Sequence, residues 1–318
     1  MKIGYKLSSE EFGPLDLVCF ARQAEDAGFD FAMISDHYHP WIGETGQSPF
    51  VWSTIGGISQ VTEKLPIITG VTCPTFRIHP AIIAHAAATA ASMLPGRFIL
   101  GVGSGENLNE HILGDEWPPT PTRIDMLAEA IDVIRTLWEG GERLQDYEGF
   151  YYKVENAKIY TKPKELPPIY IAAEGEMAAT LAGDIGDGLI AQHDNEEVVR
   201  IFKNSGGDKP CYAEATVCWN ENRDSAIKTA LKYWPIKAND VQINVDLPTT
   251  THFERLAQLA NEEIISDEIV CSEDPHDHIN EIKKYANAGY DHVCLHQVGP
   301  NQYEFIEFCK DEILPEFK

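Results

Sequence analysis

The chain has 318 residues, 43% of them apolar, and a formal net charge of −25 at pH 7. That is enough apolar sequence for a large core, yet no window approaches the roughly 20 uninterrupted apolar residues of a membrane span. So acidic a surface would repel nucleic acids and anionic membranes, which argues against both as partners.

Apolar runs and helical periodicity alternate over most of the chain. Eight strands are predicted, at residues 2–7, 31–36, 66–73, 98–103, 168–173, 188–192, 211–219 and 292–297. Eight helices are predicted at residues 15–27, 51–61, 80–94, 123–138, 177–185, 196–204, 223–234 and 276–288. This alternation favours a closed parallel (β/α)8 TIM barrel, an α/β fold in one domain over residues 1–318.

Two segments interrupt the alternation. Residues 142–163, which contain YEGFYY and KIYTKP, are expected to form a hairpin insertion. Residues 237–266 are expected to form an irregular or helical insertion before the eighth unit. A terminal helix is predicted at residues 303–314.

Seven cysteines are scattered singly, with an odd total and no CxxC pair. Neither a disulfide framework nor a zinc site is indicated, and no metal is expected. The first residues, MKIGYKL, lead directly into a strand and lack the apolar core and cleavage site of a signal peptide. We therefore expect a cytoplasmic protein. Its charge fits a high-salt or acid-tolerant cytoplasm, and equally a soluble enzyme with a solvated acidic face.

The segment ISDHYHPW, residues 34–41, places Asp36 and His37 at the end of the second predicted strand. Barrel enzymes keep their catalytic side chains at the carboxyl ends of the strands. A histidine can accept or donate a proton near neutral pH, and a neighbouring carboxylate can fix a ligand. The alternative is that the pair caps the following turn, with His39 exposed.

Three further strand ends carry small residues. Glu106 follows a glycine-rich run whose G-x-G-x-G spacing differs from that of a dinucleotide-binding motif. Gly70 in the third strand marks a bulge, a close backbone approach or a packing adjustment. The residues Ala172 to Gly175 leave room for a flat ring or a phosphate, or simply fit the barrel rim.

Taken in order, several segments resemble the luciferase-like superfamily of barrel oxidoreductases, in the branch that uses the deazaflavin coenzyme F420. The resemblance is to the family related to F420-dependent glucose-6-phosphate dehydrogenase and to F420-dependent alcohol dehydrogenases, and it covers essentially the whole chain. The segments are IGYKLSSEEF, SDHYHPW, GVTCPTFRIHPAIIAHAAAT, GRFILGVGSGENLNE, YEGFYY to IYTKP, PIYIAAEG and AGDIGDGLI.

The resemblance implies a hydride transfer between C5 of the deazaflavin and the carbinol carbon of an alcohol or sugar, or the reverse reduction, with a homodimer as the assembly. It assigns His37 as the base, Glu106 as the acid that serves the coenzyme ring, and Trp41 as an aromatic wall. It places Gly70 and Val71 at a non-proline cis peptide. Implied coenzyme contacts are Asp36, Gly70, Val71, Ser104, Gly105, Ala172, Ala173, Glu174 and Gly175. Implied substrate-side residues are Glu10, Gln192, Asn195, Gln242 and Glu268.

In the glucose-6-phosphate enzymes of this family, two lysines and an arginine bind the sugar phosphate. This chain has Asn195, Gln242 and Glu268 at the corresponding positions. Glucose 6-phosphate is therefore not the expected substrate, since Glu268 would repel its phosphate. Cations in or near the variable insertion could substitute: Lys232, Lys237 or Arg255.

Two local cations, Arg77 and Lys6, are the expected counterions for the anionic tail of the coenzyme, unless a salty cytoplasm screens its charge.

Three rival readings stay open. An FMN-dependent luciferase-like monooxygenase would share the fold but need flavin and oxygen. A glycosidase would use Asp36 and Glu106 as its two carboxylates. A coenzyme carrier would bind tightly without turnover.

Overall fold

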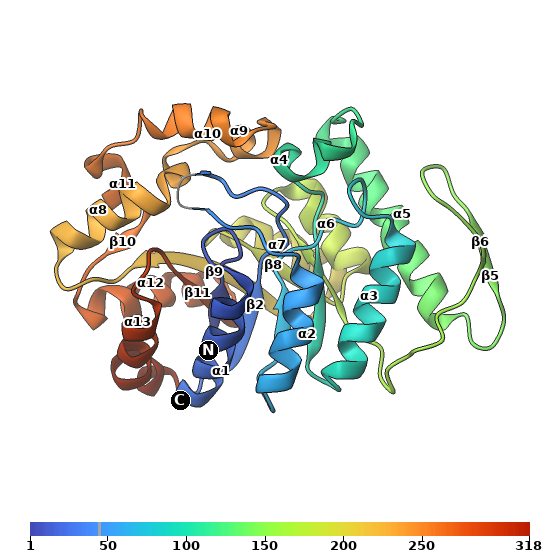
Figure 1. The fold of residues 1–318 in the computed structure, drawn as a ribbon, viewed down its shortest axis with the longest axis horizontal. Coiled ribbons are helices and arrows are strands. Elements are labelled where there is room, and N and C mark those ends of the chain that lie inside the picture. Colours follow the sequence, from blue (N-terminus) through green and yellow to red (C-terminus); the bar gives the residue numbers. More distant parts are fainter. Residues whose placement is uncertain (44–45) are drawn as a thin grey trace.

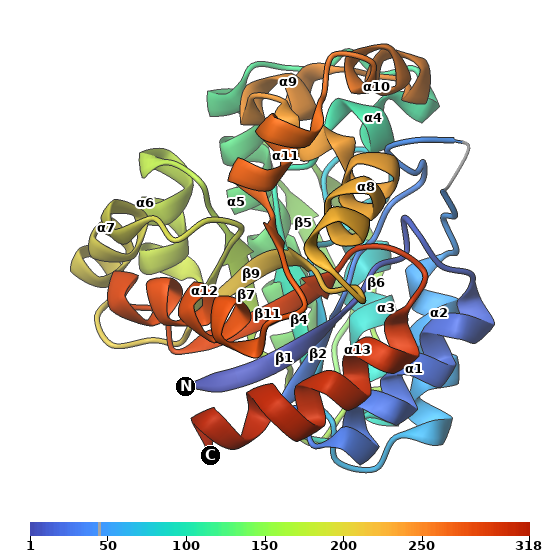
Figure 2. The same ribbon diagram turned by 90° about the vertical axis from the view of Figure 1, so that its left-hand side faces the viewer.

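The computed structural model describes residues 1–43 and 46–318. Eight parallel strands form a closed ring in the order β9, β11, β1, β2, β3, β4, β7, β8, and β8 pairs with β9 to close it. The helices surround this ring, and both termini lie at the same end of the molecule (Figures 1 and 2). The predicted (β/α)8 barrel is confirmed.

The barrel strands agree closely with the predicted ones. Their bounds are β1 Lys2–Leu7, β2 Phe31–Ile34, β3 Ile67–Thr69, β4 Phe98–Val102, β7 Ile169–Ala172, β8 Gly188–Ala191, β9 Cys211–Cys218 and β11 His292–Gln297. β2 and β3 end earlier than predicted, and the chain continues toward the site as loop. Beyond the end of β3, Thr72 still forms an isolated parallel bridge with Val102.

The larger surrounding helices also fall where they were predicted. They are α1 Pro14–Ala27, α2 Val51–Val61, α3 Pro80–Met93, α5 Thr120–Glu139, α6 Glu176–Ile185, α7 Glu196–Gly206, α8 Arg223–Tyr233, α12 Pro275–Ala288 and α13 Gln302–Phe308. The π-helical turn η3 (Cys309–Ile313) and the 3-10 turn η4 (Leu314–Phe317) follow α13, where one continuous helix was expected.

The two interrupting segments have distinct forms. Within residues 142–163, β5 (Gln145–Glu148) and β6 (Lys153–Ala157) pair antiparallel and extend beyond α5 (Figure 1). Residues 235–268 form the 3-10 turn η2 (Pro235–Ala238) and three short helices, α9 (Val241–Asp246), α10 (Thr250–Ala257) and α11 (Glu262–Glu268). A two-residue strand that was not predicted, β10 (Val270–Cys271), then pairs with the end of β9.

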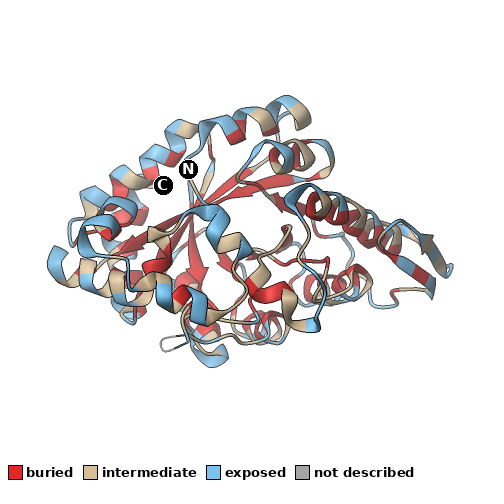
Figure 3. Cartoon of the chain, turned by 90° about the horizontal axis from the view of Figure 1, so that it is seen from above, coloured by how far each residue is buried: buried red, intermediate tan, exposed pale blue. Residues whose placement is uncertain are grey.

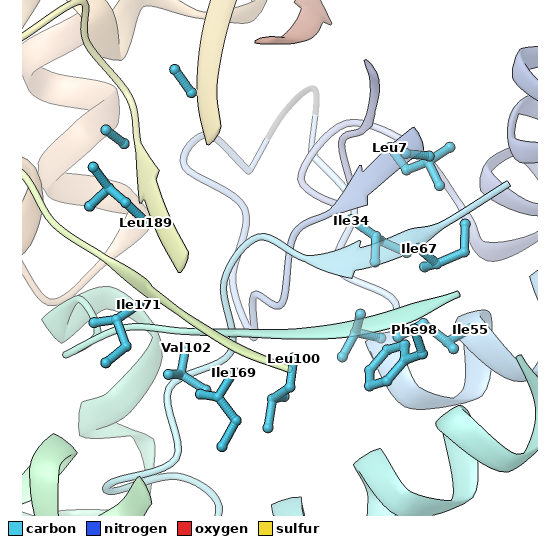
Figure 4. Packing of buried hydrophobic residues seen from close by; sticks show 14 of the residues in the cluster. Leu7, Ile34, Ile55, Ile67, Phe98, Leu100, Val102, Ile169, Ile171 and Leu189 are labelled. Atoms are coloured by element: carbon cyan, nitrogen blue, oxygen red, sulfur yellow. The ribbon is translucent and has the colours of Figure 1, made fainter. Parts of the chain in front are cut away.

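The main core lies between the barrel wall and the helices. Leu100, Val102, Ile169 and Ile171 of neighbouring strands are all buried in it (Figure 4). Seen from above, buried strands fill the centre and the helices expose their outer faces (Figure 3). The alanine-rich face of α3 is buried against this core, so within one chain it already has a packing partner.

The barrel interior changes character along its axis. At the amino-terminal end it is filled by aromatic rings, with Phe31 and Tyr212 at 5.0 Å between centroids. Gly4 makes room for this layer, because a Cβ there would lie 2.3 Å from the Phe31 ring. Toward the carboxyl end the interior side chains become charged, as in Lys6 and Glu214. The floor of the barrel is thus apolar and its mouth is polar.

Segments from two parts of the chain cover the mouth. α4 (Asn107–Glu110) and the 3-10 turn η1 (His111–Leu113) follow β4, and α9 and α10 lie beside them (Figure 1). Asp246 joins these segments, because its backbone oxygen accepts a 2.8 Å hydrogen bond from Asn107 and its carboxylate accepts one of 3.1 Å from Trp117. Among the described helices, none is long and apolar enough to cross a membrane.

Candidate active site

His37 lies between two carboxylates at the mouth of the barrel. Its Nε2 atom is 3.3 Å from Glu10 Oε1 and 4.0 Å from Glu106 Oε2, while Nδ1 lies 3.2 Å from the carbonyl oxygen of His39. A carbonyl oxygen only accepts hydrogen bonds, so in the neutral ring the proton belongs on Nδ1 and the lone pair on Nε2. The free lone pair therefore faces the space between the two carboxylates.

Glu10 is a buried carboxylate that remains ionised. Burial alone would raise its pKa, but the charges of His37 and Lys6 and a hydrogen bond from the Ser35 hydroxyl lower the pKa to about 2. A proton taken up by His37 Nε2 would therefore meet an anion. Sequence reasoning placed Glu10 at the site but gave no sign of this contact, which comes from the pairing of β1 with β2.

Glu106 is held by Asn109, which sequence reasoning did not single out. Asn109 Nδ2 donates to Glu106 Oε2 at 3.1 Å, and its Oδ1 accepts from the backbone N–H groups of Tyr38 and His39 at 2.9 and 3.1 Å. His39 also lies 2.9 Å through Nδ1 from the Leu108 oxygen, so it is part of this junction and not merely exposed. One asparagine joins the loops that carry the two predicted acid–base residues.

Trp41 forms an aromatic wall beside His37. The two rings meet edge to face at 5.2 Å between centroids, and the ring of Phe253 in α10 also meets Trp41 edge to face, at 5.0 Å between centroids. Phe253 is fully buried. Phe253 belongs to the insertion at residues 237–266, where the irregular sequence pattern did not indicate that a side chain would reach the site.

Asp36 is fixed by Arg77 and Thr72. Arg77 Nη2 is 3.0 Å from Asp36 Oδ1, the Thr72 hydroxyl donates to Asp36 at 2.8 Å, and Arg77 also faces Glu110, with Nε 3.5 Å from Oε1. Lys6 is likewise paired, with Glu214. Both cations expected to meet the coenzyme tail are therefore neutralised by internal carboxylates, and that expectation is not supported.

Glu110 provides a test by pH. Burial raises its pKa from 4.5 to about 7, although Arg77 opposes the shift. Between these values the folded state binds more protons than the unfolded state, so this group stabilises the fold at low pH and the contribution is lost as pH rises through 7. Relative to Glu110→Gln, the wild type should lose on the order of 3 kcal/mol of unfolding free energy from pH 4.5 to about pH 8. Urea unfolding of both proteins at both pH values measures this difference. An equal change in unfolding free energy in the wild type and in Glu110→Gln would contradict the prediction.

A cradle of small residues lies next to these side chains. The peptide between Gly70 and Val71 is cis, as the resemblance implies. A Cβ on Gly103 would lie 2.7 Å from Val71 and 3.4 Å from Ala172, and Gly105 has a φ of 80° that favours glycine. Close packing therefore requires glycine at Gly103 and Gly105, whereas at Gly175, beyond the end of β7, a Cβ would meet nothing within 4 Å. The small residues around the cis peptide fit a flat ring.

The remaining predicted residues lie around the rim, and each has its own contacts. The Glu174 carboxylate accepts from the Gln192 backbone and lies 2.8 Å from His193 Nδ1. Asn195 caps α7 by accepting from Glu197 and Val198, and Gln242 donates to Asp246. Gln242 and Glu268 are exposed. In the part of the chain that the structure describes, no hydrogen bond or ion pair joins His37 or Glu106 to Glu174, Gln192, Asn195, Gln242 or Glu268.

Comparison with known proteins identifies the family of the chain. The family model described as luciferase-like monooxygenase matches residues 1–292. A protein of Microbacterium testaceum named F420-dependent glucose-6-phosphate dehydrogenase is 36% identical over all of this chain and 98% of its own length. One so named from Nakamurella multipartita is 34% identical, over 100% of this chain and 97% of its length.

Solved structures show the same likeness. An F420-dependent secondary alcohol dehydrogenase, in complex with an F420–acetone adduct, superposes with a TM-score of 0.91 at 31% identity, covering 98% of each chain. A coenzyme F420-dependent tetrahydromethanopterin reductase from Methanopyrus kandleri has a TM-score of 0.80 at 23% identity, over 100% of this chain and 99% of its own, and shares the fold. The chain therefore belongs to the luciferase-like monooxygenase family.

Proposed function

We propose that this protein is an F420-dependent oxidoreductase that interconverts a secondary alcohol or sugar hydroxyl with the corresponding carbonyl. The observation that carries the proposal is His37 Nε2, placed 3.3 Å from the buried anion Glu10 and 4.0 Å from Glu106, beside a cradle of small residues. The relatives named above are F420-dependent dehydrogenases of a sugar phosphate and of a secondary alcohol, which supports this class of reaction.

The cradle fits the coenzyme implied by the family. Gly70, Val71, Ser104, Gly105 and Ala172 would lie against the ring; the remaining expected coenzyme contacts are Asp36, Ala173, Glu174 and Gly175. When bound, the deazaflavin supplies the acceptor or donor of a hydride at C5.

The chain's own residues would manage the protons. His37 Nε2 would accept the proton of the substrate hydroxyl, and the Glu10 carboxylate would stabilise the imidazolium that results. Glu106, oriented by Asn109, would act as the acid for the coenzyme ring. Trp41 would confine the reacting carbon and exclude water.

Observations at the site argue against two of the three rival functions, the glycosidase and the coenzyme carrier. A glycosidase needs two available carboxylates, but Asp36 is buried and bound by Arg77 and Thr72. A coenzyme carrier has no need of a histidine between two carboxylates. An FMN-dependent monooxygenase shares the fold, so coenzyme identity must separate it from our proposal.

Titration with oxidised F420 and with FMN, followed by quenching of tryptophan fluorescence, makes this separation. Repeating it in low and molar salt tests whether screening of the acidic surface is required. We expect F420 to bind at least about 100-fold more tightly than FMN, a difference of about 2.8 kcal/mol. Binding of FMN alone would move the protein to the monooxygenases.

The substrate should carry no phosphate. Asn195, Gln242 and Glu268 supply no cation, and the half-buried Lys237 has Glu214 and Glu174 near it, while burial lowers its pKa. We expect kcat/KM for glucose 6-phosphate to be at least about 100-fold below that for the best uncharged alcohol or sugar, because charge-assisted hydrogen bonds are missing.

The measurement is a steady-state screen of matched sugars with and without phosphate. The variant Gln242→Lys/Glu268→Arg should reduce the difference in kcat/KM between glucose 6-phosphate and the uncharged substrate, because it introduces two cations. Efficient turnover of glucose 6-phosphate by the wild type would contradict the prediction.

We also propose that the protein is a homodimer acting in the cytoplasm. The dimer is the assembly that the family resemblance implies. Light scattering after size exclusion should give twice the mass of the chain, and the mass of a single chain would contradict the dimer.

A further inference from the structure

A buried network of charged side chains lies beneath His37, inside the barrel. Lys6 pairs with Glu214 and donates a 3.1 Å hydrogen bond to the carbonyl oxygen of Gly70. His296 is fully buried, with Nε2 2.9 Å from Glu11 and Nδ1 3.7 Å from Glu214. The proton transfers proposed above do not use these residues, yet ions buried this deeply are costly unless each has a partner.

The charge of Lys6 reaches the site through Glu10. Burial lowers the pKa of Lys6, but Glu214 and Glu10 outweigh this and raise it, and Cys294 of β11 adds to their effect. The charged groups that face Glu10 are Lys6 from β1, His37 from the loop after β2 and Glu214 from β9. Lys6 thus lies between two carboxylates, Glu214 of β9 and Glu10 of the loop after β1.

The ammonium of Lys6 has little freedom to move. Its stem belongs to β1, its charge is paired with β9 and it donates to the chain leaving β3. Only about 6% of the residue is exposed, so water cannot replace these contacts. A charge held on three elements can act on a neighbouring carboxylate without the reorganisation that a mobile surface lysine would require.

We propose that Lys6 is a positioning residue for the acid–base pair: pinned by Glu214 and the Gly70 carbonyl, it keeps Glu10 ionised so that Glu10 can stabilise the charge gained by His37. The role of His37 in this inference rests on the function proposed above. Without Lys6, Glu10 would be a buried carboxyl facing Glu214, and it would take up a proton at higher pH. A neutral Glu10 would stabilise an imidazolium less well.

The test compares Glu214→Gln with the double variant Lys6→Met/Glu214→Gln. Both lack the charge of Glu214, and they differ only in the ammonium of Lys6. Lys6→Met alone would leave Glu214 buried without its lysine partner, so the double variant is the safer protein to fold. Lys6→Arg keeps the positive charge and serves as the conservative variant.

The first readout needs no coenzyme. Carbon-13 NMR of the Glu10 carboxyl, assigned by its loss in Glu10→Gln, should show a midpoint at least about one pH unit higher in the double variant than in Glu214→Gln. Lys6→Arg should keep the low midpoint. Equal midpoints in the matched pair would overturn the inference, even if the protein proves to use a different coenzyme.

The second readout is the pH profile of kcat/KM for an alcohol with F420. Its acid limb, which follows protonation of the base His37, should move to lower pH in the double variant than in Glu214→Gln, because a neutral Glu10 stabilises the imidazolium less well. A uniform fall in activity with an unchanged pH profile would assign Lys6 a merely structural role and overturn the proposal. Because the NMR result is independent of turnover, failure of this inference and failure of the proposed function can be told apart.

Discussion

Replacing His37 with alanine should lower kcat for alcohol oxidation by a factor of about 10² to 10⁴, the usual contribution of a positioned general base. The reason is the position of Nε2, which faces Glu10 and Glu106 while Nδ1 is committed to the His39 carbonyl. The affinity for F420 should change by less than about threefold, because His37 belongs to the substrate side of the proposed site.

The matched control is His85→Ala, which makes the same substitution on an exposed position of α3. It should leave kcat, affinity and stability unchanged. Steady-state kinetics and a coenzyme titration on both variants give the comparison. A His37→Ala variant that keeps more than about a tenth of the wild-type kcat would contradict the role of His37 as the base.

Replacing Arg77 with methionine should lower the free energy of unfolding by about 3–5 kcal/mol, the cost of breaking a buried charge pair by removing one partner. Arg77 contacts the buried carboxylates of Asp36 and Glu110 at 3.0 and 3.5 Å. Both would remain in place without their counterion. The measurement is urea unfolding at about pH 8. Glu110 is mostly ionised there in the wild type, so the pH dependence of its protonation contributes little to the difference.

The control for Arg77 is Arg200→Met, because Arg200 pairs with Glu197 across one turn of α7 with both side chains exposed. Exposed pairs of this kind contribute about 0.3–0.5 kcal/mol. If the two substitutions destabilise the protein equally, Arg77 does not stabilise the fold by compensating the buried charges of Asp36 and Glu110.

The strands and most helices were predictable because a parallel barrel buries each strand on both faces, which leaves continuous apolar runs between amphipathic helices. The ends of β2 and β3 were less predictable, since residues beyond Ile34 and Thr69 leave the ladder to reach the site. The helices over the mouth could not be placed from the sequence, because short helices have weak periodicity and are stabilised mainly by packing.

The site divides in the same way. His37 and Glu106 were singled out at the ends of predicted strands, and the resemblance assigned their roles and that of Trp41. The three side chains do come together. Asn109 and Phe253 were missed, because a hydrogen bond across two loops and a ring on an irregular insertion leave no periodic signal. Asn109 does lie within the GENLNE segment, three residues after Glu106, where a polar side chain on a short helix could have been considered.

The most direct test of the central claim is a single-turnover experiment without oxygen, using oxidised F420 and propan-2-ol deuterated at its carbinol carbon. The account predicts that the deuterium moves to the coenzyme as acetone forms, and that His37→Ala slows the transfer by a factor of about 10² to 10⁴. No reduction of F420 by any secondary alcohol or sugar, together with oxygen-dependent turnover in the presence of FMN, would contradict it.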